Sequence, residues 1–66
     1  MKTSNYQKAK NSLKTTSKMA KSQFKTDKPM IRQIINDSVH FLSIEYDLTE
    51  PKRDLLANYA CTLHPN

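Results

Sequence analysis

A row of lysines near the N-terminus is the clearest chemical signal in this chain. The lysines recur every three or four residues, a spacing that places them along one side of a helix. The row consists of Lys10, Lys14, Lys18, Lys21 and Lys25. Lysine is a flexible point charge, better suited to phosphates than to reading base edges. The row therefore predicts non-specific contacts with a nucleic-acid backbone. The alternatives are contact with an acidic protein surface and a helix face that is simply exposed to solvent.

The charges are divided unevenly along the chain. Residues 1–26 carry seven lysines and no acidic residue, whereas residues 27–66 carry four basic and six acidic side chains. The formal net charge is +5. This distribution predicts a basic arm, residues 1–27, attached to a slightly acidic body, residues 28–66.

Patterns for catalysis or metal binding are weak. Cys61 and His64 lie three residues apart, and His40 lies in the central segment. One cysteine and two histidines do not complete a Cys₂His₂ zinc set, and no glycine-rich loop accompanies the cysteine. We therefore expect a non-enzymatic protein with no metal and no cofactor. A lone cysteine fits a reducing compartment, which predicts a cytoplasmic location.

The longest hydrophobic segment, from Met30 to Leu48, predicts a helix that runs to about Tyr46. Its apolar residues cover an arc of roughly 220°, against roughly 100° for a typical surface helix. One neighbouring helix would cover only part of this arc. We therefore expect one stripe of it to meet a third element, a second copy or a protein partner. The stripe consists of Met30, Ile34, Phe41, Ile44 and Leu48.

A second helix is predicted after Thr49, a possible N-cap. Its apolar stripe, about 140° wide, is that of an ordinary amphipathic helix. The stripe consists of Leu55, Leu56, Tyr59, Ala60 and Leu63. Because residues 47–49 form only a short connection, the two helices are expected to pack as an antiparallel hairpin.

The N-terminal arm also has a helical pattern, with Ser4 as a possible N-cap. Like charges at spacings of four destabilise an isolated helix, so this one should need packing or an anionic partner. Tyr6 and Phe24 could stack on bases, but packing along the seam is the expected role. The thin apolar seam consists of Tyr6, Ala9, Leu13, Ser17, Ala20 and Phe24.

These patterns predict an all-α fold: an antiparallel helical hairpin preceded by a basic, partly helical arm, with a small three-helix arrangement as the alternative. The first expected function is nucleic-acid binding or regulation, with the hairpin mediating homo-oligomerisation. The second is a protein-interaction module, an inhibitor or adaptor, that docks through the wide apolar face. No segment approaches the ~18 apolar residues of a membrane span, and no motif is specific to a known family.

Overall fold

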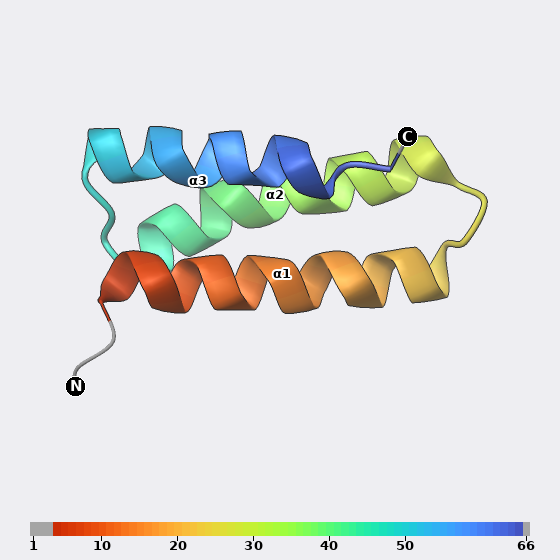
Figure 1. Cartoon of the computed structure of the whole chain (residues 1–66), viewed down its shortest axis with the longest axis horizontal. Coiled ribbons are helices and arrows are strands. Elements are labelled where there is room, and N and C mark those ends of the chain that lie inside the picture. The colour runs from red at the N-terminus through yellow and green to blue at the C-terminus, as the bar shows by residue number, and fades with distance from the viewer. Residues whose placement is uncertain (1–3, 66) are drawn as a thin grey trace.

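Three helices make up the fold. The structure is a computed structural model that describes residues 4–65. The helices are α1 (Asn5–Gln23), α2 (Lys28–Glu45) and α3 (Glu50–Leu63). The chain runs along α1, returns along α2 and turns again into α3, which lies beside both (Figure 1). The predicted all-α class is confirmed, and the three-helix arrangement left open by the sequence is the one observed.

Caps set the boundaries around α1. Ser4 is the N-cap, as predicted, and its hydroxyl accepts a hydrogen bond from the backbone N–H of Gln7 at 3.1 Å. At the other end, the N–H of Phe24 donates to the carbonyl of Ala20 at 2.8 Å. The carboxylate of Asp27 then caps α2, accepting from the N–H of Met30 at 3.2 Å. The last helical residue of α1 is thus Gln23, with Phe24 as the C-cap, and α2 begins at Lys28 after the cap at Asp27.

The connection from α2 to α3 is a Schellman motif, closed by two backbone hydrogen bonds. Asp47 N–H donates to the Ile44 carbonyl at 3.2 Å, and Leu48 N–H donates to the Ser43 carbonyl at 2.9 Å. Asp47 sits in the left-handed region with φ of 50°. The motif folds Leu48 back onto the bundle, where it is only 7% exposed. Thr49 occupies the N-cap position of α3 without a side-chain capping bond.

One hydrophobic core is shared by all three helices. Residues 1–27 were expected to form an arm, yet α1 supplies three of the buried apolar side chains. Because two helices rather than one pack on α2, most of its wide apolar arc is covered. The core consists of Ala9, Leu13 and Ala20 from α1, Ile31 and Ile35 from α2, Leu48 from the connection, and Leu56 and Ala60 from α3.

Most of the buried side chains of α1 are small. Ala9, Ser17 and Ala20 all face the core. The Ser17 hydroxyl is buried but donates to the Lys14 carbonyl at 2.8 Å, so its burial leaves no donor unpaired. Within residues 4–65, no helix combines the length and the apolar character needed to cross a bilayer.

Candidate nucleic-acid interface

Four of the five predicted lysines lie on α1. Lys10, Lys14, Lys18 and Lys21 fall within an arc of roughly 80° on a helical wheel, and they extend over about 16 Å of helix at 1.5 Å per residue. Lys14, Lys18 and Lys21 are exposed, whereas Lys10 is half-buried. We call these four residues the lysine ridge. Since α1 contains no acidic residue, none of its charges is neutralised within the helix.

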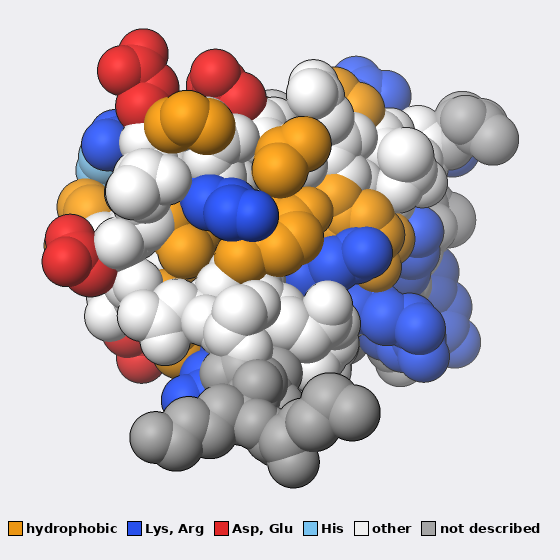
Figure 2. Space-filling view, turned by 60° about the vertical axis from the view of Figure 1, so that its left-hand side comes forward, with side chains coloured by type: hydrophobic (Ala, Val, Ile, Leu, Met, Phe, Trp, Pro, Cys, Tyr) orange, Lys and Arg blue, Asp and Glu red, His pale blue; other side chains and the backbone are white. Residues whose placement is uncertain are grey.

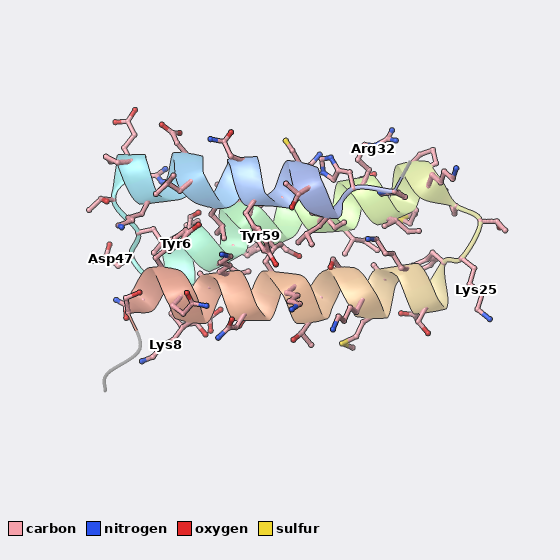
Figure 3. All side chains as sticks on the ribbon, viewed as in Figure 1. Tyr6, Lys8, Lys25, Arg32, Asp47 and Tyr59 are labelled. Atoms are coloured by element: carbon pink, nitrogen blue, oxygen red, sulfur yellow. The ribbon has the colours of Figure 1, made fainter. Side chains whose placement is uncertain are left out.

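The fifth lysine, Lys25, does not continue the ridge. It was expected on the same helix, but α1 ends at Gln23 and Lys25 lies in the turn that leads to α2. Its side chain is exposed and extends from that end of the bundle (Figure 3). The turn forms because the N–H of Asp27 donates to the carbonyl of Phe24 at 2.9 Å. Lys25 therefore lies beyond the end of the ridge.

The structure brings α3 to the edge of the lysine ridge, which the sequence did not indicate. The ammonium group of Lys10 lies 4.8 Å from the centre of the Tyr59 ring on α3. The ammonium group of Lys52, from the first turn of α3, lies 5.4 Å from the centre of the Tyr6 ring on α1. Both tyrosines are half-buried and pack against the core. Lysines and aromatic rings therefore alternate along the line where α1 meets α3, and we use the name groove for the surface formed there by Tyr6, Lys10, Lys52 and Tyr59.

Only some of the residues of this groove could be recognised from the periodicity of the sequence. Tyr6 and Tyr59 were recognised as members of apolar stripes, which their packing against the core confirms. Lys52 stood in a helix of mixed charge and attracted no prediction. The missing information was the contact between α1 and α3, because two helices that are not consecutive in the chain can meet in several registers.

The two acidic residues of α3 lie away from the groove. On the α3 wheel Glu50 and Asp54 fall roughly opposite Lys52 and Tyr59. Figure 2 shows basic side chains lying across an apolar strip, with further basic side chains gathered at one side of the view and the acidic ones near its edge. A ligand in the groove would therefore meet ammonium groups and ring faces.

Lys8 is a lysine of α1 that does not belong to the lysine ridge. It is exposed, but it lies outside the arc of the lysine ridge and points away from α3 (Figure 3). It carries the same charge as the ridge lysines at a position that does not face the groove. Lys8 therefore offers a matched control for any experiment on the ridge.

The predicted apolar stripe of α2 is split by the packing. Leu48 is buried in the core, and Ile34 is half-buried against it. Met30, Phe41 and Ile44 remain exposed, the last two at 67% and 65%. We call these three residues the outer apolar face. The stripe therefore supplies both part of the core and a surface that no described element covers.

Groups suited to metal chemistry are scattered. Cys61 is a free thiol on the exposed side of α3. His64 is occupied by a 2.9 Å hydrogen bond between its Nε2 and Oδ1 of Asn36. Among residues 4–65, no three histidine, cysteine, aspartate or glutamate side chains come together in a way that could hold a metal ion. The lysine ridge and its groove are the most concentrated chemistry on the described surface.

Comparison of the chain with protein-family models, with curated proteins and with solved structures finds no match.

Proposed function

We propose that this chain is a small non-enzymatic protein that binds nucleic acid through the phosphate backbone. The observation that carries the proposal is the lysine ridge on a helix that has no acidic residue. An ordered helix holds the four ammonium groups along one line, and Lys25 follows at its end. Each lysine that neutralises a phosphate releases a condensed counterion, and this release drives binding regardless of base sequence.

The packing of α1 supports this reading of the ridge. A basic segment of this composition could have been a solvated tail. In the structure its apolar seam faces the core, which fixes the lysines on the outer flank. The backbone of the ridge is therefore preorganised, and less backbone entropy is lost when a polyanion binds.

The salt dependence of binding tests the proposal. If five lysines engage duplex DNA, the logarithm of the association constant should fall against the logarithm of the salt concentration with a slope of roughly −4 to −5. Lys14→Ala should make that slope shallower by about one unit and weaken all sequences alike. The slope is measured by fluorescence anisotropy of a labelled duplex over a salt series.

Lys8→Ala is the control for this titration. It removes one positive charge from α1 without touching the ridge, so its slope should stay close to that of the unmodified chain. Equal slopes for the two alanine variants would mean that net charge alone matters. Absence of binding at low salt would overturn the proposal.

A second candidate function rests on the outer apolar face. Phe41 and Ile44 are one helical turn apart on α2 and are both about two-thirds exposed. Large apolar side chains grouped on a surface mark sites of protein association. In this reading the chain is an interaction module, an inhibitor or adaptor, that docks through α2, while the lysines meet an acidic protein surface.

The outer apolar face also fits the first proposal. A second copy of the chain could pack there and leave the lysine ridge of each copy open. The two functions differ in what the purified chain does with no other protein present. The first requires that it bind nucleic acid, and the second does not.

A further inference from the structure

The groove between α1 and α3 contains two lysine–tyrosine pairs that cross between the helices. Lys10 of α1 covers the ring of Tyr59 on α3, and Lys52 of α3 covers the ring of Tyr6 on α1, at 4.8 and 5.4 Å from the ring centres. Each ammonium group lies over its ring. One face of each ring is therefore turned toward the surface rather than packed beneath another apolar side chain.

The rings themselves are held in place. Both tyrosines are half-buried and pack against the core. Figure 3 labels Tyr6 and Tyr59, whose side chains lie between α1 and α3. Tyrosine has only two side-chain torsions, so little freedom remains to be lost when another flat group stacks on it. Lysine is different, because its long stem lets the ammonium group move several ångströms.

The contacts between the lysines and the rings are weak enough for a phosphate to displace them. A cation over a partly exposed ring is a weak contact, whereas a phosphate offers a full negative charge. A phosphate placed beside Lys10 or Lys52 would draw the ammonium group aside and uncover the ring face. An unpaired base of the same strand could then stack on the tyrosine.

We infer that the α1–α3 groove binds single-stranded nucleic acid, with bases stacked on Tyr6 and Tyr59 and phosphates on Lys10, Lys52 and the rest of the lysine ridge. This inference rests on the proposed function and names its substrate class. Bases in a duplex are already stacked on their neighbours and present no free face, so they cannot use the rings. Single-stranded DNA and RNA share the chemistry that the groove requires.

Tyr59→Leu in the full chain tests the inference. Leucine keeps an apolar side chain against the core but removes the aromatic face. Affinity for a labelled oligothymidylate and for an oligouridylate should fall at least about fivefold, the effect of one lost base–aromatic stack, while affinity for a DNA duplex of the same length should change less than about twofold. Tyr59→Phe, which retains the ring, should bind like the unmodified chain.

Tyr46→Leu is the matched control, because Tyr46 is also half-buried but its ring takes part in neither lysine–tyrosine pair. It should leave both affinities unchanged. A second readout is tyrosine fluorescence, which is accessible because the chain has no tryptophan. In a Tyr46→Phe background, an oligonucleotide that stacks on the groove should quench the remaining emission, and a duplex should not.

The outcomes separate the two proposals. If the chain binds neither single strands nor duplex at low salt, the proposed function fails and the inference fails with it. If salt-dependent binding persists but Tyr59→Leu affects single strands and duplex equally, or not at all, only the inference fails. Unquenched tyrosine emission on a bound oligonucleotide would also overturn it.

Discussion

Asp47 shows how one residue shapes the bundle. It occupies the left-handed conformation that ends α2, with φ of 50°. Glycine usually takes this place because it has no Cβ to clash, and the chain contains no glycine at all. Aspartate tolerates the conformation better than most residues but still at a cost in free energy. This conformation allows the two hydrogen bonds of the Schellman motif, which direct Leu48 toward the core.

Asp47→Gly should therefore stabilise the protein. Removing the Cβ relieves the left-handed conformation, and we expect a gain of about 0.5–1 kcal/mol in the free energy of unfolding. The control is Asp54→Gly, the same substitution on the exposed surface of α3, which should cost about 1 kcal/mol because glycine is a poor helix former. Urea denaturation followed by circular dichroism measures both. A loss of stability at Asp47 would show that its carboxylate contributes more than its backbone strain costs.

At the scale of the element, α1 serves the fold and the candidate site at once. Its inner side is narrow and built from small residues, with Leu13 as the only fully buried large side chain. Its outer flank carries the lysine ridge. The repulsion among those lysines opposes helix formation, and packing against α2 and α3 compensates for it. The hairpin in turn needs α1 to cover Ile31 and Ile35, which are at most 2% exposed in the bundle.

Residues 28–66 alone should therefore not form a stable hairpin. Without α1, the apolar arc of α2 has only α3 to cover it, and a chain below about 40 residues rarely folds without a staple. The truncated chain should show weak helicity and no cooperative thermal transition by circular dichroism, whereas residues 1–66 should unfold cooperatively. A truncated chain that melts as sharply as the full one would mean that α1 is an accessory to an independent hairpin.

At the scale of the whole molecule, two surfaces of different character lie on different sides. The groove with the lysine ridge lies between α1 and α3, and the outer apolar face lies on the side of α2 turned away from the core. Two copies joined through α2 would therefore leave both grooves open. Such a dimer would present two lysine ridges to one polyanion, which raises the affinity through the effective concentration of the second site.

Phe41→Ser should weaken self-association of the chain. The side chain is 67% exposed, so its loss should hardly change the thermal midpoint, yet it removes the largest apolar group of the proposed contact. We expect the dissociation constant of the dimer to rise at least about tenfold, equivalent to about 1.4 kcal/mol. Leu55→Ser on α3, which is 47% exposed, should have no such effect. Sedimentation equilibrium provides the measurement, and an unmodified chain that stays monomeric at high concentration would contradict the prediction.

The sequence by itself indicated the helices, the N-cap at Ser4 and the lysine row. These are local properties: periodicity and capping depend on residues within about one turn of each other. The boundary at Lys28 and Pro29 is local as well, because proline suits a first turn and disfavours helix before it.

Only the tertiary structure decided which apolar surfaces meet. On a wheel Leu48 and Phe41 belong to one stripe, yet the Schellman turn buries Leu48 while Phe41 stays exposed. The pairing of Lys10 with Tyr59 depends on the register between two helices far apart in the chain. That register is set by how small and large side chains of three helices interlock, and no single helix contains this information. For this reason the lysine row could be predicted from the sequence, and the groove beside it could not.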